Sequence, residues 1–492
     1  MSLPTGWAEI KFSEGIEITR GVSFSKEQRR EIPSLEYVQC LRSGNVQDHL
    51  TVENPIYVPR SALKSAAQYI RAGDSIVSMS NSYELVGKVA RAMTNQSGLA
   101  FGAFLAAFRS SIFDKDYLFY LLRSPSMQDA MRETASQTVN ISNISISGLA
   151  TISLLVPPLQ EQRRIIARLD ALTARLTRMR TELARIPLLA KRLRQQALTS
   201  ALRGHWGGDA AFDGWSNAER GELSDRRRAY LTARRGSRLR TDIPEQIDFL
   251  TNERSGWLDC RLADVISLRL GYAFKSGDFV KTGGTPLLRG ANIAPGNVDW
   301  ADKVALRPGL DEAYAAYRLS EGDIVIAMDR PVISSGLKIA RLDKNDAGSL
   351  LVQRVANPRP SEWILPDYLM AVLQSDIFMR QIEDHSTGSD LPHISGNDIL
   401  TTPCPLPPIR VQKLIAHYVC SAFAHADRLE AEAERATHLV DRLEAAILAK
   451  AFRGELDRQN PTDEPAATLL ARIRQTREAA PKSKRGRDKV PA

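Results

Sequence analysis

Two long segments of the chain carry apolar residues at alternating spacings of three and four. The first series consists of Ile165, Leu169, Leu172, Leu176, Met179, Leu183, Ile186, Ala190, Leu193 and Ala197. The second series consists of Ile415, Val419, Ala422, Ala426, Leu429, Ala433, Ala436, Val440, Leu443 and Ile447. Apolar spacing of this kind, sustained over about four heptads, predicts a coiled-coil seam along a helix. Large side chains dominate the first seam and alanines are frequent in the second, so we expect the two helices to pack on each other. The alternative is that each seam faces a different protein.

The direction of this pairing is left open by the chain connection, because a globular region between the helices permits parallel or antiparallel packing. We expect an antiparallel pair, which places one globular region at each end and gives an approximate two-fold axis. The pair then acts as a spacer between two similar heads. Pro187 lies inside the first series and is expected to kink the helix or restart it.

The whole chain is a tandem repeat, because the same short fragments return about 250 residues later. PPLQEQRRI at 157–165 is matched by PPIRVQKLI at 407–415, and Trp7 by Trp257. LRSGNV is matched by LRGANI, and the two helical segments end near ALRG and AFRG. One position of the helix motif differs, since Val411 stands where the first copy has Glu161. Each copy is therefore a globular region followed by a long helix.

The globular regions show short β-branched stretches separated by turn residues, which predict strands at 51–59, 74–80, 85–93, 323–329 and 337–342. Short helices are predicted around 117–131 and 368–382. The predicted fold class is α+β: two globular domains separated by a pair of long antiparallel coiled-coil helices, with an internal pseudo-two-fold repeat. The predicted boundaries are a first domain at 1–155, a helix at 156–204, a basic linker at 205–250, a second domain at 251–405, a helix at 406–455, and a short helix with a basic tail at 456–492.

Composition narrows the class of protein. The 492 residues are 43% apolar and 25% charged, the balance of a globular protein. No apolar run approaches the roughly 20 residues that cross a bilayer, and the N-terminus lacks the features of a signal peptide. Four scattered cysteines without metal-ligand spacing favour reduced thiols in a cytoplasmic protein. The net charge of +9 is compatible with a polyanionic partner.

Motifs for catalysis are weak. NPIY at 54–57 is similar to the NPPY-type sequence of adenine amino-methyltransferases, but it lacks the middle proline and a preceding glycine-rich turn, so a turn entering a strand is the favoured interpretation. The sequence contains no phosphate-binding loop and no HExxH pair. We therefore expect a non-catalytic binding protein.

Candidate binding residues occur at matching places in both globular regions. Arg42 with Asn45, and Arg289 with Asn292, combine the side chains that read guanine and adenine by bidentate hydrogen bonds. The alternative is that they cap a turn, because turns prefer the same residues. The further candidates are Asn81, Tyr83, Lys88 and Arg91 in the first region and Lys275, Arg330 and Lys338 in the second. The lysines are expected to contact phosphates rather than bases. The basic stretches 225–240 and 481–492 are interpreted as a solvated linker and tail.

Two heads, each followed by a long helix that begins near PPLQEQ and ends near ALRG or AFRG, resemble the DNA specificity subunits of type I restriction-modification systems. The resemblance extends from GW at 6–7 to GELDRQNPTDEPAATLL near the C-terminus, and PPLQEQRRIIARLD is its most specific element. It implies that each head is a target recognition domain that reads one half of a split, asymmetric site in double-stranded DNA.

The same resemblance implies that this chain and its partner subunits have different tasks. The helix pair would set the gap between half-sites and dock two modification (methyltransferase) subunits, and restriction (ATP-dependent translocase and endonuclease) subunits would join them. These partners would use S-adenosylmethionine, ATP and Mg²⁺, so no cofactor is expected on this chain. The residues expected to form the helix pair and its docking surface are Gln162, Leu169, Leu176, Leu183, Leu193, Gln412, Val419, Leu429, Val440 and Leu443. The alternative is a self-contained DNA methyltransferase or nuclease, which needs a catalytic core for which the repeat leaves no room.

Overall fold

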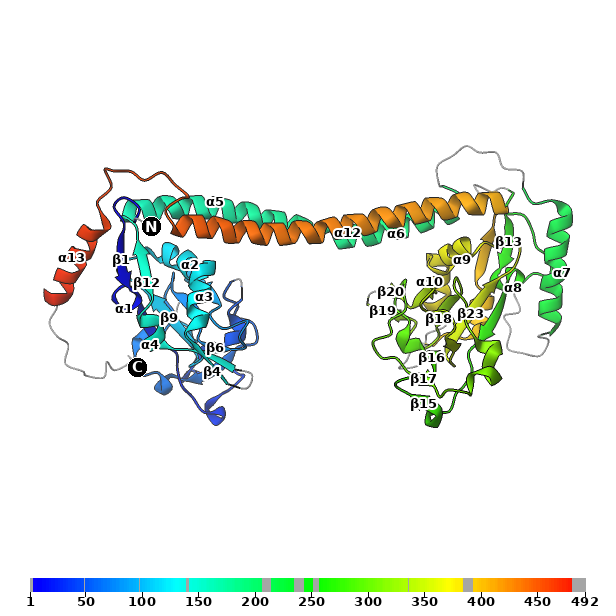
Figure 1. Ribbon diagram of the computed structural model, residues 1–492, viewed down its shortest axis with the longest axis horizontal. Coiled ribbons are helices and arrows are strands. Elements are labelled where there is room, and N and C mark those ends of the chain that lie inside the picture. The colour runs from blue at the N-terminus through cyan, green and yellow to red at the C-terminus, as the bar shows by residue number, and fades with distance from the viewer. Residues whose placement is uncertain are drawn as a thin grey trace. The chain divides into compact units, whose positions relative to one another are not determined.

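The computed structural model describes residues 3–47, 49–96, 98–138, 141–205, 214–233, 243–250, 256–334, 336–383 and 393–479. The chain divides into two compact units (Figure 1). Unit 1 comprises Met1–Ala184 and Glu434–Ala492, and unit 2 comprises Arg185–Ala433. Each unit combines helices with small sheets, which confirms the predicted α+β class. The basic tail and the basic residues 234–240 lie outside the described residues.

Unit 1 contains a globular part, head 1 (residues 3–156), built on small sheets whose strands come from distant parts of the sequence. A two-stranded sheet pairs β1 (Ala8–Lys11) with β12 (Ser153–Val156). The other sheets, in spatial order, are β2 (Glu17–Arg20), β9 (Leu105–Arg109), β5 (Ser75–Ser78) and β7 (Val89–Arg91); β4 (Ile56–Pro59), β3 (Tyr37–Leu41) and β8 (Ala100–Phe101); and β10 (Ala135–Thr138), β11 (Ile141–Ile144) and β6 (Ser80–Asn81). The short helices are α1 (Phe12–Gly15), α2 (Lys115–Arg123), α3 (Pro125–Glu133) and α4 (Ile146–Ala150).

Unit 2 contains head 2 (residues 256–406), whose sheets follow the same plan. A two-stranded sheet again joins the first strand, β13 (Leu258–Arg261), to the last, β24 (Pro403–Leu406). The other sheets are β14 (Ile266–Leu270), β23 (Val355–Pro360), β18 (Ile324–Ala327) and β21 (Ile339–Arg341); β15 (Phe279–Val280), β17 (Ala305–Leu306), β16 (Thr285–Leu288) and β22 (Leu350–Leu351); and β19 (Val332–Ile333) with β20 (Gly336–Leu337). The short helices are α8 (Leu262–Val265), α9 (Pro366–Leu373), α10 (Asp376–Glu383) and α11 (Gly396–Leu400).

The two heads repeat one another down to strand register. In head 1 the sheet order β2-β9-β5-β7 pairs Ile76 with Ala90, and in head 2 the order β14-β23-β18-β21 pairs Val325 with Ala340. All four of these residues are buried. Since a slip of one residue would turn every side chain to the other face, the shared register shows that the repeat preserves the same core positions.

The structure differs from the sequence prediction in two helical segments and in the length of one strand. Each short helix predicted around 117–131 and 368–382 is in fact two consecutive helices, broken at Ser124 and Ser375. The side chain of Ser124 caps α3, and Pro125 follows in its first turn, a combination that starts a new helix. The strand predicted at 51–59 shortens to β4, because Asn54 adopts a left-handed φ of 50° that no strand accommodates.

Long helices in unit 1 pair in antiparallel fashion. Helix α5 (Leu159–Leu183) runs beside the C-terminal part of α12 (Ile409–Phe452) (Figure 1). Near the start of α5, Ile165 and Leu169 share a core with Leu448 and Phe452. Nearer its end, the Arg180 guanidinium binds the carboxylates of Asp441 at 2.7 Å and Glu444 at 2.6 Å. Contacts therefore move backward along α12 as they move forward along α5, which is the predicted antiparallel direction.

In unit 2, helix α6 (Ile186–Leu202) pairs with α12 in the same antiparallel way. Helix α6 begins as a new helix after α5 ends at Leu183. Pro187 lies in the first turn of α6, where its missing N–H costs nothing, so the helix is restarted there. Arg194, two heptads after Arg180, binds Glu430 at 2.6 Å and also Asp427. Leu198 and Leu202 share a core with residues near the start of α12, including Ile415 and Val419.

The apolar seams are only partly covered. Ile165, Leu169, Leu176, Ala190, Ala197, Ile415, Val419, Ala426, Ala433 and Val440 are buried, as expected for the seam. Leu183 and Leu193 are half-buried. Leu429 and Leu443, expected in the seam, are 38% and 48% exposed, and Met179 is 47% exposed. A contact between two helices buries one stripe and leaves its flanks open. The part expected of Leu429 and Leu443 in the helix pair and its docking surface stays a prediction.

Gln162 and Gln412 do not belong to a docking surface, because both side chains are completely buried. Gln162 Oε1 accepts the backbone N–H of Asp114 at 2.8 Å, and its Nε2 donates to the carbonyls of Pro157 and Ile112. Buried polar groups are nearly always hydrogen-bonded, and here one side chain provides partners for groups on two segments. The glutamine fastens the start of α5 to the loop that precedes α2.

Gln412 makes the same three contacts in unit 2. Its Oε1 accepts from Leu365 N at 2.8 Å, and its Nε2 donates to the carbonyls of Trp363 and Pro407 at 2.9 Å each. The neighbouring position differs between the copies. Glu161 accepts from Trp7 Nε1 at 3.0 Å in unit 1, whereas Val411 is buried in the core of unit 2. Burial raises the pKa of Glu161, and the Trp7 hydrogen bond opposes that shift.

Each unit is completed by one further helix. In unit 1, α13 (Ala466–Ala479) lies beside β1 and α1 (Figure 1), and Arg474 binds Glu14 at 3.1 Å. In unit 2, α7 (Asn217–Ala233) lies beside α8, where Arg227 binds Asp264 at 2.6 Å. Residues 225–233 therefore form a docked helix, and their interpretation as a solvated linker is wrong.

Gln412→Ala is expected to lower the free energy of unfolding of unit 2 by at least about 2 kcal/mol, because three buried backbone groups lose their partner. Lys413→Ala, at the exposed neighbouring position, is the matched control and should change stability by less than about 0.5 kcal/mol. Denaturant unfolding followed by circular dichroism measures both. Equal stability of the two variants would contradict the anchoring role.

Arg227→Ala and Arg474→Ala remove equivalent arginines with different burial. Arg227 and Asp264 are 2% and 1% exposed, whereas Arg474 and Glu14 are 63% and 46% exposed. Breaking the buried pair leaves Asp264 without its counter-charge and should cost about 3–5 kcal/mol. Breaking the exposed pair should cost about 0–1 kcal/mol. Thermal unfolding of the two variants should therefore differ clearly, and similar losses would show that burial does not govern these pairs.

Candidate nucleic-acid interface

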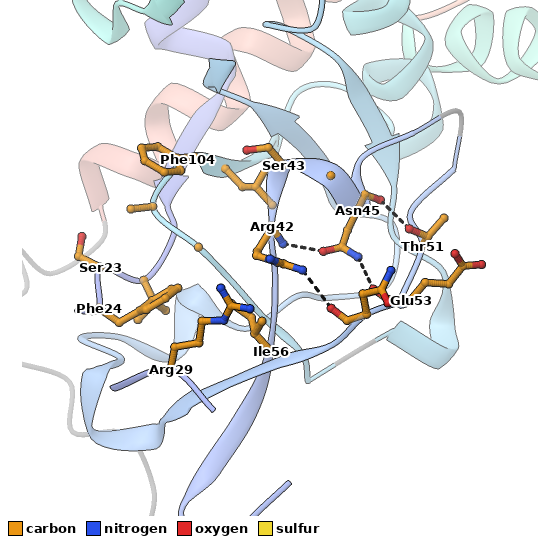
Figure 2. Close-up of a pocket in the computed structure, with 16 residues that line it drawn as sticks. Ser23, Phe24, Arg29, Arg42, Ser43, Asn45, Thr51, Glu53, Ile56 and Phe104 are labelled. Carbon is orange, nitrogen blue, oxygen red and sulfur yellow. Dashed lines mark hydrogen bonds between the residues drawn. The ribbon is translucent and has the colours of Figure 1, made fainter. Parts of the chain in front are cut away.

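Head 1 contains an open pocket of about 660 Å³, shown in Figure 2. It forms where the end of β3, the 3₁₀ helix η2 (Ser43–Asn45) and the turn between β8 and β9 come together. The residues that line it are Val22, Ser23, Phe24, Arg29, Arg42, Ser43, Gly44, Asn45, Thr51, Glu53, Asn54, Ile56, Gly102, Ala103, Phe104 and Leu105. We refer to it as the head 1 pocket. Two arginines and two phenylalanines give it both donors and apolar surface.

Asn45 is a structural residue of this pocket. Its Oδ1 accepts from Arg42 N at 2.8 Å, its Nδ2 donates to the Glu53 carbonyl at 3.0 Å, and it is 7% exposed (Figure 2). An amide whose oxygen and nitrogen are both engaged in a turn has little capacity left for a base. The turn interpretation therefore describes Asn45 better than base recognition does.

Arg42 differs from Asn45 because its guanidinium reaches the pocket. One nitrogen, Nη2, donates to the Asn54 carbonyl at 3.2 Å. Phe24 and Phe104 lie on the other side of Arg42 from Asn45 (Figure 2). Phe104 is 64% exposed, so a large apolar side chain faces solvent beside a guanidinium.

Head 2 has a pocket of about 1140 Å³ at the equivalent place. Its lining residues are Phe274, Ser276, Phe279, Arg289, Gly290, Ala291, Asp329, Arg330, Lys338, Val352, Gln353, Arg354 and His393. We refer to it as the head 2 pocket. Phe274 and Arg289 correspond in the repeat to Phe24 and Arg42, so both heads form their pocket on the same part of the fold.

In head 2, the side chains of Arg289 and Asn292 also form hydrogen bonds within the protein. Asn292 is 1% exposed, accepts from Arg289 N at 3.2 Å and donates to the Asp299 carbonyl at 3.0 Å. Arg289 Nη2 donates to the backbone carbonyl and the carboxylate of Asp302. Asn292 thus has the same structural role as Asn45, and Arg289 is held by an acidic neighbour that Arg42 lacks in the described residues.

The charged residues of the head 2 pocket include three of the candidates named from the sequence: Arg289, Arg330 and Lys338. Burial lowers the pKa of Lys338, Asp329 opposes that shift, and Arg330 adds to it. Lys275 lies between two lining residues, Phe274 and Ser276. The structure therefore gathers the candidates of head 2 around one pocket.

The remaining candidates of head 1 are more scattered. Lys88 Nζ donates to Gln47, close to the head 1 pocket. Arg91 forms an ion pair with Asp116 at 2.8 Å and lies over the Phe119 ring. Tyr83 lines a different, mostly acidic hollow with Glu84, Asp129, Arg132 and Glu133, and Asn81 is tied to Ser78 and to the backbone of Ser82. Tyr83 and Asn81 therefore do not join the pocket.

The residues that the structure adds to the two pockets, and that sequence reasoning missed, include Phe104, Asp329, Arg354 and His393. No motif surrounds them, and an exposed phenylalanine resembles a core residue when read from sequence. The repeat was the signal that could have found them, because Phe104 and Arg354 occupy corresponding positions, just before β9 and β23 respectively.

A second surface feature lies on the helix pair within unit 1. It is an apolar groove of about 640 Å³ lined by Arg175, Arg178, Met179, Glu182, Leu183, Ala436, Leu439, Val440 and Leu443. Leu439 and Leu443 are 60% and 48% exposed. Contiguous exposed apolar side chains between polar rims are typical of a protein-binding surface.

Metal sites and membrane-spanning helices are both absent from the part of the chain that the structure describes. It holds no group of three or more His, Cys, Asp or Glu side chains that could bind a metal ion. None of its helices is long and apolar enough to cross a membrane. Burial raises the pKa of Cys40 to about 12, which makes this thiol a poor nucleophile.

Comparisons with known proteins agree with one another. The family model described as the type I restriction modification DNA specificity domain matches residues 4–188. The chain is 26% identical over 500 residues to the type I restriction enzyme EcoKI specificity subunit of Escherichia coli strain K12, and 28% identical over 510 residues to the StySPI specificity subunit of Salmonella potsdam. Both matches cover 99% of each chain. They support a recognition subunit and not the alternative of a self-contained methyltransferase or nuclease.

Solved structures share the fold. The HsdS subunit from Thermoanaerobacter tengcongensis superimposes with a TM-score of 0.54 at 19% identity, covering 93% of this chain and 99% of that one. A chain from a structural study of complex assembly and conformational transition in the type I R-M system gives a TM-score of 0.62 at 18% identity, covering 93% and 100%. These solved structures share the repeated heads and the long paired helices of this fold. The family model identifies residues 4–188 as a type I restriction modification DNA specificity domain, and the chain is similar over nearly its whole length to the specificity subunits of type I restriction enzymes.

Proposed function

We propose that the chain recognises a split, asymmetric site in double-stranded DNA, with one half-site read by each head. The observation that carries the proposal is the pair of equivalent pockets. Each presents a phenylalanine and an arginine from the same repeat positions, whereas the other lining side chains differ. A shared backbone frame that carries different side chains is suited to the recognition of two different DNA sequences. Contacts to bases determine the sequence specificity, whereas contacts common to both heads position the DNA.

The catalytic steps belong, in this proposal, to partner subunits. Two modification subunits would methylate adenine with S-adenosylmethionine, and restriction subunits would use ATP and Mg²⁺. The support is that the full-length relatives are named specificity subunits of type I restriction enzymes. The proposal places the complex in the cytoplasm, where the chromosomal DNA of a bacterial cell lies.

The apolar groove of unit 1 is proposed as a docking site for a modification subunit. Met179, Leu439 and Leu443 are exposed along a helix pair that already buries its central stripe. Apolar side chains that remain open after the helices have paired are available to a further protein, and the arginines at the rim can bind acidic groups.

Methylation mapping of a host that expresses this chain with its modification subunits should show one split N6-methyladenine motif. The motif should disappear in cells that express the modification subunits alone. Loss of methylation at one undivided motif, or no dependence on this chain, would contradict the proposed function. The mapping also gives the sequences of both half-sites.

Leu439→Asp is expected to weaken binding of a modification subunit by about tenfold or more, because the charge would be buried in an apolar contact. The control is Leu35→Asp, which changes a leucine of head 1 that is 96% exposed and should have no effect. Titration of purified subunits, followed by analytical ultracentrifugation, measures the affinity. Unchanged binding by both variants would move the docking site away from the groove.

A further inference from the structure

The residue just before strand β9 in head 1 and strand β23 in head 2 is held in the same way in both heads. Phe104 accepts a backbone hydrogen bond from Met79 at 2.8 Å, and Arg354 accepts one from Met328 at 2.8 Å. The same methionines then accept backbone hydrogen bonds from Ile144 and Ile394, at 2.9 Å each. The backbone hydrogen bonds are therefore the same in both heads, although Arg354 has a left-handed φ and Phe104 does not. The side chain at this position is apolar in one head and cationic in the other.

Backbone strain is concentrated at these pockets. Among the described residues, the non-glycine residues with a left-handed φ are Asn54 (50°), Arg330 (45°) and Arg354 (65°). Asn54 lines the head 1 pocket, and the two arginines line the head 2 pocket. Such conformations are unfavourable for residues other than glycine and persist where the surrounding structure imposes them, commonly at functional sites. The strain is thus located where the heads differ.

In head 1, the presented side chain has no charge. Phe104 is 64% exposed and lies near Phe24 and Arg42 at the mouth of the pocket (Figure 2). An exposed phenylalanine leaves a large apolar surface in water. In the major groove, the apolar group that such a side chain can contact is the 5-methyl group of thymine.

In head 2, Arg354 is oriented by two neighbours. Its Nη1 lies 3.1 Å from His393 Nε2, and its Nε lies 3.8 Å from the Asp329 carboxylate. His393 Nδ1 in turn lies 2.7 Å from Asp329. The Arg354 and Asp329 side chains remain 58% and 54% exposed, so the network directs the guanidinium without removing it from solvent.

The carboxylate of Asp329 distinguishes a base contact from a phosphate contact. A carboxylate beside the arginine repels a phosphate, whereas it does not disfavour the neutral acceptors of a base. Arginine donates to O6 and N7 of guanine, and an acidic side chain can accept from N4 of cytosine. Arg354 and Asp329 together therefore complement both edges of a G·C pair.

Arg42 and Arg289 carry the same side chain in both heads, although only Arg289 also binds a carboxylate, that of Asp302. They occupy the same repeat position, and each donates to a backbone carbonyl, of Asn54 and of Asp302 respectively. A contact that is common to both heads positions the DNA more readily than it discriminates between sequences. Phe104 and Arg354, in contrast, are different side chains that follow the same pattern of backbone hydrogen bonds.

We propose that Phe104 and Arg354 are specificity-determining residues, with Phe104 selecting a thymine in one half-site and Arg354 selecting a guanine in the other. The inference rests on the proposed function and deepens it by assigning a base to one position of each head. Asp329 and His393 are positioning residues for Arg354.

The test uses the complex of this chain with its modification subunits and a DNA library randomised at both half-sites. Arg354→Ala should lower the preference for guanine at one position by about tenfold or more, and leave the other half-site unchanged. Arg354→Lys should lose the same preference, because it keeps the charge but not the bidentate geometry. Phe104→Ala should lower the preference for thymine at one position of the other half-site by several-fold.

The matched controls are Arg380→Ala, an exposed arginine on α10 paired with Asp376, and Met93→Ala, an exposed apolar residue of head 1. Neither should change any position, and thermal unfolding should show that every variant is folded. Equal weakening on all sequences, with the lysine variant restoring affinity, would assign Arg354 to phosphate and overturn the inference while leaving the proposed function intact. A wild-type complex without any sequence preference would overturn both.

Discussion

A single buried glutamine at the start of each long helix is the interaction on which the rest of each unit depends. Gln162 and Gln412 each bind one backbone N–H and two backbone carbonyls on two segments of the unit. One of these groups lies at the junction where the last strand of a head becomes a helix, and the other two lie in the loop that precedes α2 or α9. Because both glutamine side chains are buried, their hydrogen bonds fix the first turn of the helix, which begins at Leu159 or Ile409, and so fix the direction in which the helix leaves the head. The antiparallel pairing within each unit follows from that fixed start.

The two heads share a backbone frame but carry different side chains on it. Asn45 and Asn292 use their amides to build a turn, and this turn holds Arg42 and Arg289 at corresponding places. Side chains that complete hydrogen bonds inside the fold cannot be exchanged without loss of stability. Those that project from the frame, such as Phe104 and Arg354, are free to differ. Recognition can therefore diverge between the heads while their cores remain alike.

The helix pair shows a comparable division between stability and association. Its buried stripe and the ion pairs of Arg180 and Arg194 hold the helices together within each unit. The leucines on the flank, Leu439 and Leu443, contribute little to that contact and remain exposed. An apolar seam that is too wide for two helices to cover leaves apolar side chains exposed to water, which is unfavourable for the chain alone. It becomes understandable when the helices also serve as a surface for another subunit.

The sequence by itself determined the duplication, the α+β class, the two long helices and their seams, because periodicity and repetition depend on local spacing alone. It also placed Arg42 and Arg289 at the sites. Only the tertiary structure decided that Gln162 and Gln412 are anchors, that Arg227 is a buried partner of Asp264, and that Phe104 and Arg354 face the same kind of pocket. These roles arise from contacts between segments far apart in the chain. A sequence pattern records which residues could be buried or charged, whereas their partners are fixed only when the segments pack.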